Sequence, residues 1–442
     1  MKKNTNGSAG KHGGKKKFLL LLLIIPIAVI AAVFFISKEY DAGEYKPAAA
    51  YSGILRACDK DIVDVSGNKI LLRGTNLGGW LIMEEWQCPM NATDAMLMYD
   101  TLTERFGYDR AMELLKIYED NFIVESDFDN IKALGLNCVR LPFWYRNFTD
   151  ENGEWKLNEQ GEIDFSRLDW VVEQCRKRGM YVILDLHGAP GFQSDAAHSG
   201  KYKDSDLFDD TAEGEAFRDK TVELWQAIAE HFRDNETVAC YDLLNEPGCD
   251  MNVTAMQGDI AKLYDRLIKA IREIDPQHMI SVECIWRMNA MPSPQKYGWT
   301  NVLYQMHTYD YSEFTISGII ASVKAHFYYN VPVYIGELNA DGLIGYMLNE
   351  YNNNNISWTT WTYKGVQSGF STWFLYGLEG ENIKADIFND SYDTIAKKWG
   401  AAIRTENAKP NEFMLSVVSD AANGVDFEKS NEKNMKIYDK YQ

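Results

Sequence analysis

Two glutamates follow apolar segments that have the composition of buried strands. Glu246 stands in YDLLNEPG, residues 241–248, and Glu337 ends the run VYIGE at 333–337. Pro247 cannot donate the backbone hydrogen bond that continues a sheet, and it favours an extended conformation for the residue before it. We therefore expect the carboxylate of Glu246 to be held at a strand terminus. A lone carboxylate of this kind also caps helices or closes turns, so its role depends on its surroundings.

Other polar and aromatic side chains end neighbouring apolar segments in the same way. They are Asn76, Arg140, His187, Asn245, Glu283, His307, Tyr309 and Trp361. If the segments are strands of one barrel, these side chains converge where the carboxyl ends of the strands meet. Two carboxyl groups about 5–5.5 Å apart can cleave a glycosidic bond, one as nucleophile and one as the acid that protonates the leaving oxygen. The pattern therefore indicates glycoside hydrolysis.

The neighbours of the two glutamates suggest how the roles divide. Glu337 must be ionised to attack the anomeric carbon, and Arg140 and Tyr309 are the donors expected to hold its charge. Glu246 must carry a proton that it can give to the departing oxygen. The remaining side chains are expected to support the carboxylates or bind the sugar, by hydrogen bonds or by stacking of the indole: Asn76, His187, Asn245, His307 and Trp361.

Eight short apolar segments recur along the chain, with helix-period stretches between most of them. The candidate strands are 70–76, 136–142, 180–188, 238–247, 279–286, 302–309, 331–339 and 356–364, and the clearest helices are 165–179, 214–234 and 259–275. This alternation over about 350 residues predicts an α/β fold of the (β/α)8 TIM barrel type, for which ~250 residues is typical. A doubly wound sheet is the alternative, but its Gly-rich nucleotide loop is missing from the sequence.

The barrel is predicted to form one catalytic domain over residues 51–405. The stretch 62–74 resembles a hairpin, with Gly67-Asn68 as its turn, that closes the bottom of the barrel. The C-terminal extension, 406–442, is polar and is predicted to be a loosely attached helix.

Charge and composition limit the classes of function. The net charge is -19, and the dense basic cluster lies at the N-terminus, so the body of the chain lacks the Lys and Arg clusters that neutralise nucleic-acid phosphates. Twelve Trp and 25 Tyr suit either a large core or a cleft that stacks sugars. Seven cysteines without a C-x-x-C pair predict neither a zinc ribbon nor a disulfide framework, although a bridge from Cys240 or Cys249 stays open.

A lysine-rich segment, residues 1–17, precedes an uncharged apolar run at 18–36. About 20 apolar residues cross a bilayer core as a helix, and the lysines favour the cytoplasmic side for the N-terminus. We predict a cytoplasmic basic tail, a transmembrane signal anchor at 18–37, a tether at 38–50 and an extracellular catalytic domain. A cleaved secretion signal is the alternative, although its apolar core is about 7–15 residues long.

Six segments carry a resemblance to glycoside hydrolase family 5, a clan A family of retaining (β/α)8 enzymes, over roughly residues 51–405. The segments are LRGTNLGGWL (72–81), NCVRLPF (137–143), DLHGAPGFQ (185–193), LLNEP (243–247), HTY (307–309) and IGELN (335–339). The resemblance implies Glu246 as acid/base and Glu337 as nucleophile. It also implies a supporting set of Arg140, His187, Asn245, His307, Tyr309 and Trp361.

Within that family, NLGGW and DLHGAPG are similar to the exo-β-1,3-glucanase branch, whereas residues 192–206 and the end of the last strand, WTTWTYKG, depart from it. We therefore expect a retaining hydrolase of β-1,3-glucan or a related β-glucoside. An endo-β-1,4-glucanase (cellulase) or a mixed-linkage glucanase on the same site stays open.

Two other classes compete with an anchored hydrolase. One is a non-catalytic carbohydrate-binding surface protein, which would not need a proton donor. The other is a metalloenzyme with His187, His307 and the glutamates as ligands, but no H-x-H or H-E-x-x-H pair is present to assemble its site. We expect no metal or cofactor, and a monomer.

Overall fold

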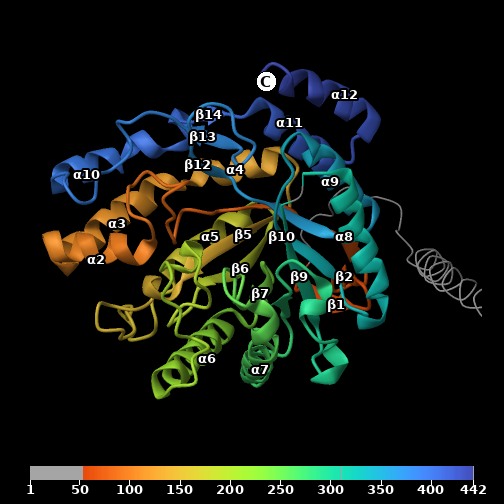
Figure 1. Ribbon diagram of the computed structural model, residues 1–442, viewed down its shortest axis with the longest axis horizontal. Coiled ribbons are helices and arrows are strands. Elements are labelled where there is room, and N and C mark those ends of the chain that lie inside the picture. Colours follow the sequence, from red (N-terminus) through yellow and green to blue (C-terminus); the bar gives the residue numbers. More distant parts are fainter. Residues whose placement is uncertain (1–52, 310, 442) are drawn as a thin grey trace, which may run out of the picture.

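The computed structural model describes residues 53–309 and 311–441. Within them, eight parallel strands close into a barrel, with each strand beside its neighbours in sequence and β11 paired with β4 (Figure 1). The strands are β4 Arg73–Asn76, β5 Cys138–Trp144, β6 Tyr181–Gly188, β7 Val238–Asp242, β8 Met279–Glu283, β9 Val302–Tyr309, β10 Val333–Asn339 and β11 Ser357–Thr360. All eight predicted strands and the (β/α)8 barrel are confirmed.

Helices lie around the barrel, and some of them pack on other helices at its periphery (Figure 1). They are α2 Ala95–Phe106, α3 Tyr108–Phe122, α4 Glu125–Ala133, α5 Ser166–Lys177, α6 Ala212–Phe232, α7 Val253–Arg272, α8 Glu313–Ala325, α9 Ile344–Asn353, α10 Tyr392–Lys398, α11 Glu412–Ala422 and α12 Phe427–Tyr438. The three clearest predicted helices are α5, α6 and α7. Gly179, with φ +60°, supplies the left-handed residue after α5 that ends this helix.

A small antiparallel sheet closes the amino end of the barrel, as predicted. Its strands are β1 Arg56–Cys58, β2 Asp61–Val63 and β3 Lys69–Ile70. Ile62 and Ile70 pack in one cluster with Tyr181 and Met279, the first residues of β6 and β8. The tight turn depends on Asp64, whose carboxylate accepts the backbone N–H groups of residues 66 and 68.

The C-terminal residues are an integral part of the fold, so the prediction of a loosely attached helix is wrong. Strand β14, Lys409–Pro410, pairs with β13, Tyr376–Leu378, in a second small sheet that includes β12, Lys364–Val366. Helices α11 and α12 pack against α9. The average polarity of the tail concealed an apolar stripe at helical spacing on α11, and its residues enter the main core: Phe413, Met414, Val417 and Val418.

We expect Phe413→Ala to lower the free energy of unfolding by about 3–5 kcal/mol, because it leaves a cavity in a packed core. The Phe413 ring is buried and lies 4.9 Å from the ring of Tyr438 on α12. Denaturant unfolding measures the change. Val425→Ala, at an exposed position of the same tail, is the control. Equal stability of the two variants would contradict the docking of the tail on the barrel.

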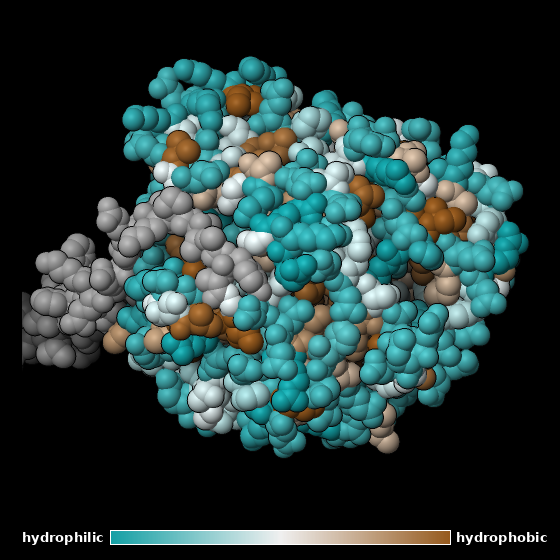
Figure 2. Space-filling view, turned by 180° about the vertical axis from the view of Figure 1, so that it is seen from behind, coloured by the Kyte–Doolittle hydropathy of each residue, from teal (hydrophilic) through white to brown (hydrophobic). Residues whose placement is uncertain are grey.

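Within the part of the chain that the structure describes, none of the helices combines the length and the apolar character that a membrane span requires. The predicted basic tail, the signal anchor at 18–37 and the tether at 38–50 lie outside the described residues. The face in Figure 2 is largely hydrophilic, with hydrophobic residues in small separate groups. That distribution is normal for the outer surface of a folded domain.

Candidate active site

The structure brings the predicted strand-end residues together at the carboxyl end of the barrel. Asn76, Glu283 and Tyr309 are the last residues of β4, β8 and β9. The others lie within strands β5, β6, β9 and β10, or in the segments that follow β7 and β11: Arg140, His187, His307, Glu337, Asn245, Glu246 and Trp361. The eight parallel strands direct these side chains around one axis, which is why distant segments meet here.

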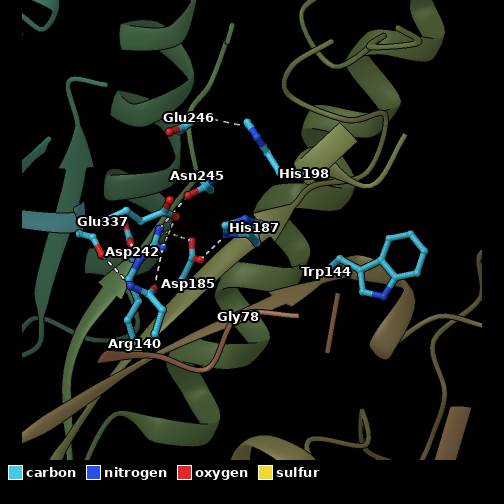
Figure 3. A network of polar contacts seen from close by, with 12 residues as sticks. Gly78, Arg140, Trp144, Asp185, His187, His198, Asp242, Asn245, Glu246 and Glu337 are labelled. Atoms are coloured by element: carbon cyan, nitrogen blue, oxygen red, sulfur yellow. Dashed lines mark hydrogen bonds and ion pairs between the residues drawn. The ribbon is translucent and has the colours of Figure 1, made fainter. Parts of the chain in front are cut away.

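Arg140 organises the floor of this site (Figure 3). The side chain is fully buried, and its guanidinium donates to Asp242 at 2.8 Å and to Glu337 at 2.8 Å. It also donates to the side-chain oxygens of Asn76 and Asn245, at 3.1 and 2.9 Å. Planar guanidinium groups suit such multiple, directed contacts. Arg140 therefore fixes the Glu337 carboxylate and the Asn245 side chain in one frame.

Glu337 receives a hydrogen bond on each carboxylate oxygen. Arg140 donates to Oε1, and the hydroxyl of Tyr309 donates to Oε2 at 2.6 Å. Burial, with the charge of Glu337, raises the pKa of Tyr309 well above its ordinary value, so this hydroxyl keeps its proton and stays a donor. The two donors predicted from the sequence are therefore in contact with the carboxylate that they were expected to hold.

Glu246 adopts a backbone conformation that the sequence did not predict. Strand β7 ends at Asp242, and Glu246 has φ +43°, a left-handed conformation rather than the extended one expected before Pro247. Such a conformation costs about 1–3 kcal/mol for a residue other than Gly. A tertiary contact offsets part of this cost, because the backbone N–H of Glu246 donates to Oε2 of Glu283 at 2.7 Å.

His307 lies between the two glutamates. Its Nδ1 is 2.7 Å from Oε1 of Glu246 and 3.6 Å from Oε2 of Glu337. The Ser281 hydroxyl donates to the carboxamide oxygen of Gln305, which leaves the amide NH2 of Gln305 to donate to Nε2 of His307. Nδ1 then carries the hydrogen and donates to Glu246. Burial lowers the pKa of His307 to about 3, so the ring is neutral.

His187 and Trp361 form the adjoining wall. Their rings stack with centroids 5.4 Å apart and planes 12° apart, and Nδ1 of His187 bonds to Asp185 at 2.7 Å. Burial lowers the pKa of His187 to about 3, so this ring is neutral as well. A Cβ at Gly78 would lie 2.9 Å from the Trp361 ring, so only glycine fits against the indole here.

Indole rings border the mouth of the site. Trp373 lies 5.3 Å from the Tyr309 ring and 5.3 Å from Trp86, measured between ring centroids. The ring centroid of Trp286 lies 6.4 Å from that of Tyr309. Trp86 and Trp286 are both 47% exposed, so they offer flat apolar surfaces to a ligand.

Sequence reasoning missed several buried side chains of the site. Asp185 and Asp242 share the guanidinium of Arg140. The two-residue period of a strand could have identified Asp185, because Asp185 and His187 are two residues apart and point to the same face of β6. Glu84 lies on the loop between β4 and α2, and His198 on the loop after β6, where no residue period predicts direction.

Glu84 adds a further buried carboxyl group near Glu246 and Glu337. Trp86 and Gln87 donate to its two oxygens at 3.0 and 2.6 Å. Burial raises the pKa of Glu84 to about 7, and the charges of Glu337 and Glu246 add to this effect.

The folded protein therefore binds this proton more tightly than the unfolded chain does. The contribution to stability is complete below pH 4.5, the ordinary pKa, and is lost as the pH rises to about 7. We expect the melting temperature of Glu84→Gln to decrease less than that of the wild type as the pH rises over this range. Calorimetry at a series of pH values measures the melting temperature. The control is Glu85→Gln, which changes the exposed residue next to Glu84. Parallel curves for Glu84→Gln and wild type would contradict the buried titration.

Two groups of side chains could hold a metal ion. Glu246, Glu283 and His307 form one, and Glu246 with His198 and Cys249 forms the other. Ligand atoms within each group lie within 4.8 Å of one another. All seven cysteines lie in the described part of the chain, and each is a free thiol there.

An arginine-held carboxylate opposite a second carboxyl group, in a (β/α)8 barrel, is the arrangement of a glycoside hydrolase. The model for "Cellulase (glycosyl hydrolase family 5)" matches residues 104–367. The chain belongs to glycosyl hydrolase family 5.

Among curated proteins, the chain is 34% identical over 266 residues to "Beta-xylosidase" of Phanerodontia chrysosporium, covering 59% of this chain and 52% of that protein. It is 31% identical over 215 residues to "Probable glucan 1,3-beta-glucosidase A" of Aspergillus fumigatus, covering 47% and 48%. The chain thus spans about half the length of these relatives.

Solved structures share the fold at low sequence identity. An endogalactoceramidase is 20% identical with a TM-score of 0.51, covering 71% of this chain and 75% of that chain. A rutinosidase from Aspergillus niger is 15% identical with a TM-score of 0.53, covering 67% and 90%. These likenesses establish the barrel fold alone.

Proposed function

We propose that the protein is a retaining β-glycosidase that hydrolyses β-glucans by double displacement. The observation that carries the proposal is the pair of carboxyl groups on either side of His307. Glu337 is held by Arg140 and Tyr309 in the position of the nucleophile, whereas Glu246 faces a neutral imidazole.

The separation of the two carboxyl groups supports retention of configuration. Nδ1 of His307 lies 2.7 Å from Oε1 of Glu246 and 3.6 Å from Oε2 of Glu337, so these two oxygens can be no farther apart than the sum of the two distances. Inverting enzymes hold a water between carboxyl groups that are about 6.5–9.5 Å apart, and the oxygens here are closer than that. The space suits direct attack on the sugar by a carboxylate.

The residues then act in two steps. Glu337 attacks the anomeric carbon while Glu246 protonates the departing oxygen, which gives a glycosyl-enzyme and releases the first product. Glu246, now a carboxylate, takes a proton from the water that cleaves this intermediate. Asn245, held by Arg140, can accept or donate a hydrogen bond to the hydroxyl beside the reacting carbon.

The substrate is proposed to be a β-1,3-glucan or a related β-glucoside. The NLGGW and DLHGAPG segments and the relatives named glucan 1,3-beta-glucosidase support this choice. Exposed Trp86 and Trp286 suit stacking of neutral sugar rings. An endo-β-1,4-glucanase or mixed-linkage glucanase is the alternative, and the relative named beta-xylosidase adds a β-xyloside to the candidates.

Product analysis on four substrates tests this choice: laminarin, a mixed-linkage glucan, a soluble cellulose and aryl β-xyloside. We expect the highest kcat/KM on laminarin, with retained configuration in the first product by NMR. Faster release from cellulose or xyloside would overturn the substrate, and an inverted product would overturn the mechanism. A binding protein would be favoured by two results together. The wild type would be inactive on all four substrates, and Glu337→Gln would bind the glucans as tightly as the wild type does.

The chain is further proposed to be anchored by residues 18–37 with its barrel outside the cell. The lysine bias before the apolar run supports this orientation. Protease added to intact cells should then shed an active fragment, because the tether at 38–50 would be accessible. A barrel that resists protease until the cells are lysed would contradict the orientation, and recovery of the intact active chain in the culture medium would contradict the anchor.

A further inference from the structure

Glu246 faces a second group of side chains besides His307. Nε2 of His198 lies 3.3 Å from Oε2 of Glu246 (Figure 3), and the thiol of Cys249 faces the same carboxyl group. The ligand atoms of the three side chains all lie within 4.8 Å of one another. Imidazole nitrogen, cysteine sulfur and carboxylate oxygen are the ligands that Zn²⁺ uses in proteins.

The backbone holds the two loops that carry these side chains together. Gly248 donates its N–H to the carbonyl of Gln193 at 2.8 Å, and Asp195 donates to the carbonyl of Cys249 at 3.3 Å. Cys249 itself donates to the carbonyl of Glu246 at 3.0 Å. The loop after β7 is thus bonded to the loop after β6, so the imidazole and the thiol meet without rearrangement of the chain.

The group is accessible and lies in a negative field. The side chain of His198 is 18% exposed and Cys249 is half-buried, so an ion can enter from the mouth of the barrel. The negative charge of Asp250 acts on both side chains. A pocket lined by one sign of charge raises the local concentration of the opposite ion.

We propose that His198, Glu246 and Cys249 form an inhibitory site for a thiophilic divalent cation such as Zn²⁺. Three protein ligands leave a fourth position for water in tetrahedral coordination. As the metal bonds form, the Cys249 thiol gives its proton to solvent, and Glu246, which carries a proton in its proposed role as acid, gives up that proton as well. A carboxylate bonded to the ion cannot protonate a leaving oxygen. This last consequence rests on the proposed role of Glu246, whereas binding of the ion does not.

Cobalt binding tests the site without any turnover. Co²⁺ added to the purified full chain should give a thiolate-to-cobalt charge-transfer band that saturates at one equivalent. Cys249→Ser should lose this band, whereas Cys58→Ser, at an exposed cysteine far from the barrel mouth, should keep it. Wild type without the band, or an unchanged band in Cys249→Ser, would overturn the site.

Inhibition tests the consequence. Zn²⁺ should suppress hydrolysis of an activated aryl β-glucoside by wild type, and EDTA should restore it. We expect Cys249→Ser and His198→Asn to raise the inhibition constant at least about tenfold, each measured against its own uninhibited rate, since loss of a ligand costs at least as much as loss of a supporting contact. Equal inhibition of all three proteins would overturn the inhibitory role even if the cobalt band were present.

Discussion

Glu337→Gln should abolish turnover while the barrel stays folded. The amide cannot attack the anomeric carbon, so the covalent intermediate does not form, and a rate decrease of at least ~10³ is expected by comparison with other losses of a catalytic nucleophile. The amide keeps the size of the carboxylate and leaves an oxygen that can accept from Arg140 or Tyr309. Hydrolysis of laminarin and of an aryl β-glucoside measures the loss.

Circular dichroism and the melting temperature are the controls for this variant. Glu350→Gln, at a partly exposed position on α9, provides a matched substitution that should leave the rate unchanged. Activity of Glu337→Gln within tenfold of wild type would refute Glu337 as the nucleophile.

The loss of activity in Glu246→Ala should depend on the leaving group of the substrate. A poor leaving group needs a proton in the first step, so hydrolysis of a glucan should fall strongly. The aryl group of an activated aryl glycoside departs without that proton, so the glycosylation rate on this substrate should be much better preserved. Single-turnover release of the aryl group, compared with laminarin hydrolysis, measures the difference.

Azide separates the roles of the two glutamates. It needs no general base, so with Glu246→Ala it should attack the glycosyl-enzyme and give a product of retained, β, configuration. With Glu337→Ala it should attack the substrate directly and give the inverted, α, product. The same anomer from both variants, or rescue of neither, would refute this division of labour even within the same family.

The sequence predicted the parts of the site that regular structure positions. Alternation of apolar segments located every barrel strand, and Arg140 and Glu337 followed because both stand near the ends of predicted strands, where the side chains of a barrel converge. Strand ends also located His307 and Tyr309, although the hydrogen-bonding pattern that makes His307 a donor to Glu246 depends on Gln305, which the sequence did not distinguish.

The features that the sequence did not predict depend on contacts between segments far apart in the chain. The left-handed conformation of Glu246 is stabilised by the carboxyl group of Glu283, which lies on the next strand. Glu84 and His198 reach the site from loops, whose direction follows from tertiary packing and not from residue period. Helix α11 was missed because the charged residues of the tail outweigh its apolar stripe in any average of composition.

One guanidinium lies among three carboxyl groups at the floor of the site, and this arrangement affects which substrate charges the site accepts. Arg140 faces Asp185, Asp242 and Glu337, while the two buried imidazoles add no positive charge because both are neutral. An uncharged sugar brings no charge of its own to such a site, and positive charge that develops on its ring is attracted to the carboxylate of Glu337. A uronate or sulfated sugar would bring its negative charge to the carboxylate of Glu337, whereas Asp185 and Asp242 lie buried behind it, where burial raises the pKa of Asp185 to about 7 and also raises that of Asp242. We therefore expect neutral glucans to be hydrolysed faster than acidic polysaccharides of matching linkage.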